Sequence, residues 1–200
     1  METRQAELEL SLIKKMMDDS RKISLDNGWH FIYWGSLVTI ALLLNYILII
    51  SHGKQEYIGW MWFIMMIGGA VAGGIIERKH ERKKNVHTLA GRIIGSLWFA
   101  SGIAMFIYGF LGSISGGYNP VYICPVISTS LGISYFTSGE IQQVKLLKYI
   151  AFGWWIGAVF LFFFPGIHTL LIFAIMMICF QVIPGVILNK KFKKDIDVQL

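Results

Sequence analysis

A single acidic residue follows a run of hydroxyl side chains in the most polar of the chain's apolar stretches. This stretch, residues 121–141, contains Ser134, Ser138 and then Glu140. Carboxylates in membrane segments are costly to bury, and they often bind a cation or relay a proton. The pattern therefore predicts an ion or proton site at Glu140, Ser134 and Ser138. The alternative is an ordinary interfacial carboxylate, because Glu140 lies near the end of the stretch, where water and Lys145 reach it.

The other reactive residues do not form a catalytic set. Ser138 invites comparison with the nucleophile of intramembrane serine proteases, but the one histidine of the last apolar stretch, His168, stands at its outer start and not within the span, where a base for Ser138 would be needed. His52 and His168 could approach each other on one side of a membrane, yet two histidines are too few for a zinc site. Cys124 and Cys179 lack paired metal-ligand spacing. We therefore expect no enzymatic activity, no catalytic residue, no metal and no cofactor.

Membrane-spanning helices must position these residues. Apolar residues make up 55% of the 200-residue chain and charged residues only 15%, whereas soluble proteins have about 25% charged residues. Six continuous apolar stretches each approach the roughly 20 residues that a helix needs to cross a bilayer. The predicted fold is therefore all-α, with spans at residues 29–50, 57–76, 93–111, 121–141, 147–164 and 167–188. Together they form a six-helix domain over residues 29–188.

The basic residues indicate how these spans are oriented. The chain has 18 Lys and Arg residues. If each apolar stretch crosses the membrane in turn, all of them except Lys54 fall in segments on the same side. Cations near a span resist translocation, so we expect a multi-pass protein of the bacterial cytoplasmic (inner) membrane with both termini in the cytoplasm. The cations form short clusters beside the spans and no continuous basic face, so nucleic acid is not an expected partner.

The segments outside the spans are charged. Residues 1–28 form a cytoplasmic segment in which residues 5–24 have the apolar spacing of an amphipathic helix. Such a helix lies on the membrane surface or docks a cytoplasmic protein. Residues 189–200 form a basic cytoplasmic tail. The expected surface for a partner or for lipid comprises Lys14, Lys15, Arg78, Lys79, Arg82, Lys83 and Lys84.

Glycines recur at matching depths along the spans. Residues 64–79 align with residues 175–190 without a gap and share half of their positions, which favours three copies of one helical hairpin. Small residues four apart let two helix backbones approach closely in lipid, and they also make a homo-oligomer plausible. The pairs expected to serve helix packing are Gly69 with Gly73, Gly91 with Gly95, and Gly153 with Gly157.

Two sequence patterns resemble known bacterial membrane proteins. The segments GSLWFASGIAMFIYG and GWWIGAVFLFFFPG, with glycines ending the even-numbered spans, resemble HdeD-type acid-resistance proteins over residues 30–190. The segment SRKISLDNGWHFIYWGSL is similar to the entry segment of six-span proteins common in Bacteroidetes. The resemblance implies three hairpins and a stress-related role, without a catalytic residue. The charged loop ERKHERKKN departs from the compact turns of the HdeD type.

Two functions are compatible with these patterns. The first is a non-enzymatic membrane protein that acts by binding, by sensing or as a stress-related membrane component. Its expected partners are the lipid bilayer, a cytoplasmic protein and a second copy of the chain. The alternative is a small-solute or ion transporter or channel with a polar path along the fourth span, a class in which repeats and polar spans are common.

Overall fold

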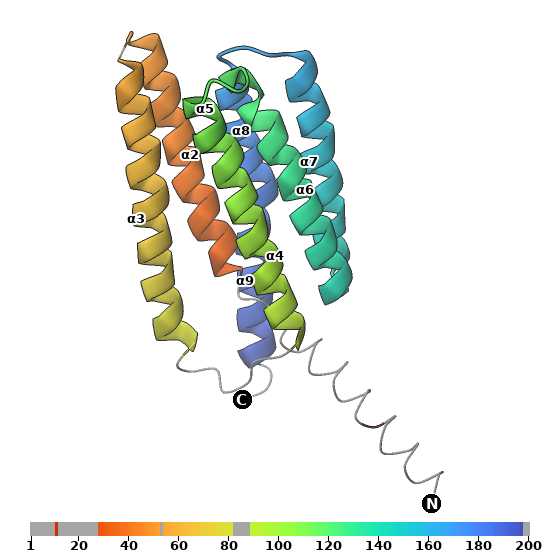
Figure 1. Ribbon diagram of the computed structural model, residues 1–200. Helices are drawn as coiled ribbons and strands as arrows, with labels where there is room; N and C mark the ends of the chain where they lie inside the picture. Colours follow the sequence, from red (N-terminus) through yellow and green to blue (C-terminus); the bar gives the residue numbers. More distant parts are fainter. Residues whose placement is uncertain (1–10, 12–27, 53, 82–88, 198–200) are drawn as a thin grey trace, which may run out of the picture.

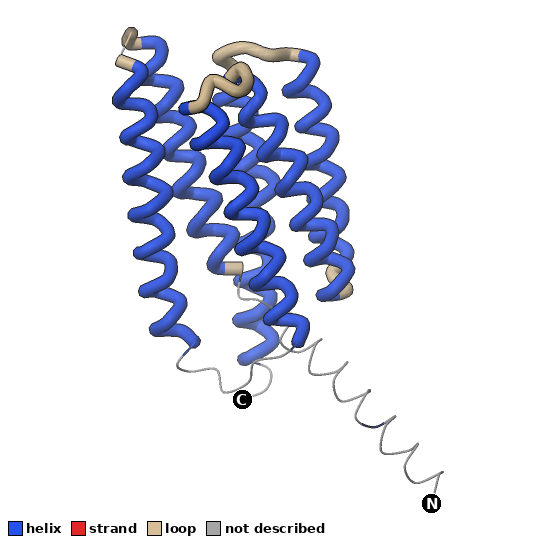
Figure 2. The backbone as a smooth tube through the Cα atoms, viewed as in Figure 1, coloured by secondary structure: helices blue, strands red, loops and turns tan. Residues whose placement is uncertain are grey.

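The computed structural model describes residues 11, 28–52, 54–81 and 89–197. These residues form long helices joined by short loops, and no strand occurs among them (Figure 2). Apart from Ser11, the amino-terminal helix expected at residues 5–24 lies outside the described residues, as do Lys14, Lys15, Arg82, Lys83 and Lys84. The all-α fold predicted from the sequence is confirmed for the described part of the chain.

Six helical rods make up the bundle in Figure 1. Three are single helices: α2 (Trp29–Ile50), α3 (Gln55–Glu81) and α7 (Lys145–Phe163). Three are composite. The third rod joins α4 (Leu89–Phe106), the π-helix η1 (Ile107–Leu111) and α5 (Gly112–Ile114). The fourth joins the 3₁₀-helix η2 (Pro120–Tyr122) to α6 (Ile123–Gln142), and the sixth joins α8 (Thr169–Met177), the π-helix η3 (Ile178–Val182) and α9 (Ile183–Asp197).

All six rods are long and apolar enough to cross a membrane. The qualifying segments are Trp29–Ile50, Glu56–Ile76, Ala90–Ile114, Pro120–Gln142, Lys145–Phe163 and Thr169–Lys191. The prediction of six apolar helices long enough to cross a membrane is therefore confirmed, and each predicted span overlaps one of these segments. The last rod extends beyond the predicted span, because α9 continues through residues 189–197.

Local sequence explains where the fourth and fifth rods begin and end. The Asn119 side chain accepts a hydrogen bond from the Val121 backbone N–H, 3.1 Å away, and caps the chain's entry into η2, where Pro120 occupies the first position. At the other end of α6, Gln143 adopts a left-handed conformation with φ 54°. The Val144 N–H then bonds to the Gly139 carbonyl, so the helix terminates and α7 starts at once.

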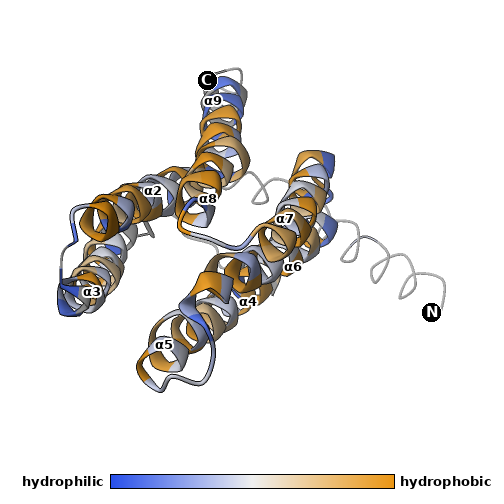
Figure 3. Ribbon diagram, turned by 90° about the horizontal axis from the view of Figure 1, so that it is seen from above, coloured by the Kyte–Doolittle hydropathy of each residue, from blue (hydrophilic) through white to orange (hydrophobic). Residues whose placement is uncertain are grey.

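The helices are packed unevenly. Figure 3 shows α8 between α2 and the α6–α7 pair, with α3 on the outer side of α2, and α4 packs against α6. Buried residues make up 28% to 44% of the apolar segments in rods one, four, five and six. The corresponding shares are 6% for α3 and 0% for the α4 rod. The core therefore consists of α2 and α6–α9, and α3 and α4 are peripheral.

Neighbouring spans in the sequence do contact each other, as hairpins require. Helices α2 and α3 pack together, as do α4 and α6, and α7 and α8. The most extensive contact, however, joins α6 to α7, which belong to different predicted hairpins. The division into three repeated hairpins remains a prediction.

Candidate functional site

The charged side chains of the described residues lie at the ends of the rods. We call the end where α2, α4 and α7 begin and α3, α6 and α9 finish the basic end (Figure 1). It carries exposed cations on four rods: Arg78, Arg92, Lys145, Lys190, Lys191 and Lys194. Lys79 belongs to the same end of α3. Lys54 and Glu56 lie at the opposite end.

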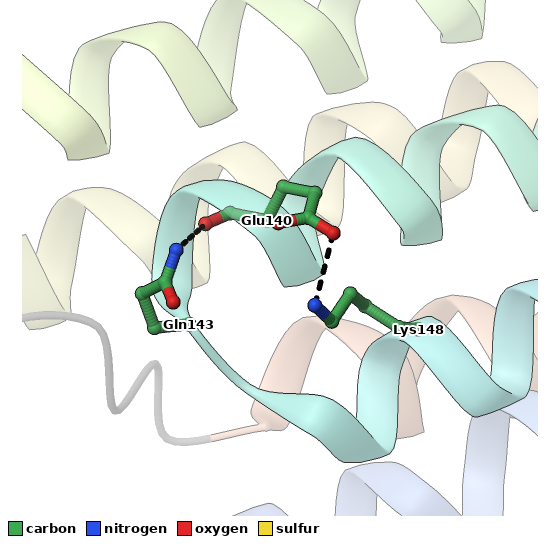
Figure 4. A network of polar contacts seen from close by, with 3 residues as sticks. All are labelled: Glu140, Gln143 and Lys148. Atoms are coloured by element: carbon green, nitrogen blue, oxygen red, sulfur yellow. Dashed lines mark hydrogen bonds and ion pairs between the residues drawn. The ribbon is translucent and has the colours of Figure 1, made fainter.

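Glu140 lies at the basic end and is paired. Its carboxylate forms an ion pair with the Lys148 ammonium group of α7, with 2.9 Å between Oε1 and Nζ (Figure 4). Its carbonyl accepts a hydrogen bond of 2.8 Å from Gln143 Nε2. The Glu140 side chain is 46% exposed and that of Lys148 31%. Glu140 is therefore a partly exposed carboxylate whose ion pair joins α6 to α7.

The two candidate serines have a different environment from Glu140. Ser134 and Ser138 are fully buried and lie one helical turn apart on the face of α6 that meets α4. Ser134 Oγ lies 2.7 Å from Ser101 Oγ, and Trp98 Nε1 donates a hydrogen bond of 3.1 Å to Ser138 Oγ. Because residues two apart on a helix do not face each other, the structure groups Ser134 with Ser138 and separates Glu140 from both.

The hydroxyl of Ser128 links α6 to α7 by a hydrogen bond. Ser128 is fully buried and donates a hydrogen bond of 2.7 Å to the carbonyl of Trp154. From the opposite direction, Trp155 Nε1 donates to the carbonyl of Thr129, 3.3 Å away, and its indole lies against Gly132. In lipid, where apolar side chains gain little by leaving the solvent, such bonds and close contacts hold helices together. The polar residues of the fourth span thus attach α6 to both of its neighbours.

The predicted glycine pairs fall into two groups. Gly69 and Gly73 face α2, where a Cβ atom would meet the side chains of Leu37 and Tyr33, and Tyr33 donates a hydrogen bond of 2.8 Å to the Gly69 carbonyl. Gly153 and Gly157 of α7 similarly face Phe180 and Met176 of the last rod. Gly91 and Gly95 of α4 are exposed, and a Cβ atom on Gly95 would meet nothing within 4 Å.

An aromatic layer fills the centre of the bundle, and the sequence patterns did not predict it. The Tyr135 ring lies 5.2 Å from Phe31, 5.4 Å from Trp98 and 6.4 Å from Trp154, measured between ring centroids. Trp154 in turn contacts Phe180, with centroids 5.7 Å apart. The one available signal was the position of Trp98 and Trp154 in the middle of their spans, away from the interfaces where tryptophan usually gathers.

Several buried polar atoms have no hydrogen-bond partner among the residues that the structure describes. They are Asn45 Oδ1, Tyr118 Oη, Tyr135 Oη, Trp154 Nε1 and Gln181 Oε1. A buried polar group left unpaired costs about 1–3 kcal/mol, so most buried polar groups in folded proteins are paired. Tyr135 and Trp154 belong to the aromatic layer, and Gln181 directly follows one of its members.

No cluster of metal ligands appears in the described ranges, where no three His, Cys, Asp or Glu side chains are placed to hold an ion. The polar groups buried in the described core include hydroxyl, indole and amide groups. No family model matches this chain, and no curated protein or solved structure shows significant similarity to it.

Proposed function

We propose that this protein is a non-enzymatic membrane sensor that acts through binding. The observation that carries the proposal is the uneven packing of the bundle. Helices α3 and α4 are 6% and 0% buried in their apolar segments, whereas the other four rods form a packed core. These two peripheral helices flank residues 82–88, which include the basic residues Arg82, Lys83 and Lys84.

Weak lateral packing makes α3 and α4 responsive to the surrounding lipid. Tyr33 and Leu37 of α2 contact α3 at Gly69 and Gly73, and Trp62 of α3 is partly buried against the core. Because burial of apolar surface does not drive helix association inside a bilayer, a few such contacts hold α3 only loosely. Changes in bilayer thickness alter helix tilt at a cost of fractions of a kcal/mol per Å, so lipid composition is able to shift these helices relative to the core.

A shift of α3 and α4 would move the basic segment that joins them. In the proposed orientation this segment lies in the cytoplasm, where it contacts anionic lipid or an acidic partner protein. Two positions of α3 and α4 relative to the core, each favoured by different lipid surroundings, are sufficient to transmit a signal across the interface. Arg78 and Arg92 are exposed at the basic ends of α3 and α4 and would move with these helices.

Distance measurements between spin labels test this proposal. In a cysteine-free background, labels at Val71 of α3 and Ile133 of α6 report on the peripheral helix, and labels at Ile133 and Ile175 report on the core. All three side chains are more than half exposed. In nanodiscs of short-chain and long-chain lipids, the first distance is expected to change and the second to stay constant. A Val71–Ile133 distance that is identical in all lipids would contradict the sensor.

A small-solute or ion transporter is the second candidate. The observation that favours it is the set of unpaired polar atoms on Tyr135, Trp154 and Gln181 in the bundle interior. Proteoliposomes loaded with a pH or ion indicator measure flux directly. Flux that depends on the protein and falls in Glu140→Gln would support transport through the fourth span. Wild-type protein without flux would count against it.

A further inference from the structure

The last rod carries an exposed stripe that changes from apolar to basic along its length. Ile183 and Ile187 of α9 are 47% and 48% exposed. Three exposed lysines follow Ile183 at i+7, i+8 and i+11, namely Lys190, Lys191 and Lys194. Residues at these intervals lie on one face of an α-helix. The lysines therefore continue the stripe of the two isoleucines toward the hydrophilic end of α9 (Figure 3).

The opposite side of α9 packs on the bundle. Gly185 and Leu188 are buried. A Cβ atom on Gly185 would lie 3.0 Å from both the Gly28 carbonyl oxygen and the Ile32 backbone nitrogen of α2. This close approach fixes the rotation of α9 about its own axis, so the exposed stripe faces away from the bundle.

The three lysines keep their charge available for a ligand. No ion pair or hydrogen bond joins their side chains to another residue in the described ranges. Glu140, the described acid at the basic end, is paired with Lys148. Residues 189–200 contain four lysines and two aspartates, so the segment as a whole is positively charged.

The height of the lysines along the rod matches the headgroup region of a bilayer. The apolar segment of this rod ends at Lys191. A bilayer is about 40–45 Å thick with its headgroups and about 30 Å without them, which leaves roughly 5–7 Å for each headgroup layer. At the helical rise of 1.5 Å per residue, Lys190 and Lys194 are about 6 Å apart along the axis. One headgroup layer therefore accommodates all three ammonium groups while Ile183 and Ile187 face hydrocarbon.

We propose that Lys190, Lys191 and Lys194 form a binding surface for the phosphate groups of anionic phospholipids. Lysine binds phosphate as a point charge, and its apolar stem lies along hydrocarbon while the ammonium group reaches the interface. The two isoleucines favour a lipid over an acidic protein, because they offer the acyl chains of the same molecule an apolar contact. The surface goes beyond the proposed sensor role, since α9 belongs to the packed core and not to α3 or α4.

Native mass spectrometry of the full-length protein tests the surface. The protein in an uncharged detergent is titrated with phosphatidylglycerol or with phosphatidylcholine of the same acyl chains. We expect phosphatidylglycerol to bind more tightly, because each lysine near an anionic lipid contributes roughly fivefold in affinity. The triple variant Lys190→Gln/Lys191→Gln/Lys194→Gln should lose roughly tenfold or more of its affinity for phosphatidylglycerol and none for phosphatidylcholine. The triple Lys→Arg variant keeps the charges and should retain the wild-type preference.

A pair of single variants serves as the matched control. Lys194→Gln and Lys54→Gln each remove one exposed ammonium group, from opposite ends of the bundle. The first should weaken phosphatidylglycerol binding roughly fivefold, and the second should leave it nearly unchanged.

Equal affinity of the wild type for the two lipids would overturn the proposal and leave the lysines to an acidic protein. An unchanged affinity of the triple Gln variant would overturn it too, since anionic lipid would then bind elsewhere on the chain. None of these variants alters α3 or α4, so the outcome is independent of the spin-label test of the sensor.

Discussion

Glycines that look alike in the sequence have different surroundings in the fold. A Cβ atom on Gly35 would lie 2.7 Å from Val182 Cγ2 and 3.3 Å from the Val182 backbone nitrogen. A Cβ atom on Gly95 would meet nothing within 4 Å. Both glycines begin the same GSL motif, so sequence alone assigns them one role. Their contacts assign close packing of α2 on η3 to Gly35 alone.

Gly35→Ala should therefore destabilise the protein, by about 1–3 kcal/mol, because the added methyl group overpacks the contact with the last rod. Gly95→Ala is the matched control, and it should be neutral or stabilise the helix by up to about 1 kcal/mol. Reversible unfolding in mixed micelles with increasing denaturing detergent measures both values. Equal effects of the two substitutions would show that α2 does not pack on η3 as described.

Glu140 forms an ion pair in which both side chains are partly exposed to solvent, and such pairs contribute about 0–1 kcal/mol. Glu140→Gln should lower the free energy of unfolding by less than about 1 kcal/mol, and Lys148→Met should have a similar effect. The same unfolding assay measures both variants. A loss of several kcal/mol in Glu140→Gln alone would mean that the carboxylate has another partner besides Lys148.

The partners of Ser134 and Ser138 could not be predicted from the sequence. Their spacing shows that both lie on one face of a helix, but Ser101 and Trp98 are 33 and 40 residues away in the chain. Nothing in local periodicity says which neighbouring helix supplies a hydrogen bond. Residue types therefore predicted a polar face on the fourth span, and only the fold shows what that face contacts.

At the scale of helices, α4 is attached to the core mainly through α6. Trp98 and Ser101 both bond to α6, and the Trp98 ring also lies 5.6 Å from Phe31 of α2. Much of the rest of α4 is exposed, including Phe99 at 73%, although Met105 also packs against the core. A helix held by so few interactions depends strongly on each of them.

A double-mutant cycle measures one of these interactions. Trp98→Phe removes the indole N–H, and Ser138→Ala removes its acceptor. The coupling free energy between the two substitutions should be about 0.6 kcal/mol, the average for hydrogen bonds between membrane helices. Equilibrium unfolding in detergent gives the four stabilities. A cycle at Trp155 and Ser138, which form no contact of this kind, should give a coupling close to zero, and a zero value for Trp98 would contradict the described contact.

Helix positions were predictable to within a few residues, because long apolar runs are read directly from the sequence. The π-helical turns η1 and η3 were not, since they depend on tertiary packing. The predicted spans at residues 57–76 and 93–111 also fall short of α3 and the α4 rod. Both helices extend beyond the apolar core into flanking polar or small residues, where hydropathy no longer distinguishes helix from loop.

The whole molecule has most of its described cations at one end, and this distribution fixes the expected orientation. Lys54→Cys and Lys194→Cys, each in a cysteine-free background, test it with a membrane-impermeant maleimide. In cells whose outer envelope lets the maleimide through, the cysteine of Lys54→Cys should be labelled without further treatment. The cysteine of Lys194→Cys should be labelled only after the membrane that holds the protein is permeabilised. The reverse pattern would place the basic end outside.

The lateral order of the six rods is the part of the fold that the sequence could not predict. A hydropathy profile shows how many segments are able to cross a membrane, but it contains no information on which of these segments become neighbours. The contact of α2 with α8, η3 and α9 joins the first span to the last. Where α2 meets α9, the backbones approach closely, since a Cβ atom on Gly185 would lie 3.0 Å from both the Gly28 carbonyl oxygen and the Ile32 nitrogen.

This contact between the ends of the chain has a consequence for biosynthesis. The first span enters the membrane early, yet its main partners emerge from the ribosome only after the other spans have been made. Until then, the buried face of α2, with Phe31 and Asn45, has only lipid, α3 or insertion factors to cover it. Contacts between distant parts of a chain form late and leave intermediates exposed. Release of the chain before residue 185 should therefore yield a protein that quality-control proteases of the membrane degrade.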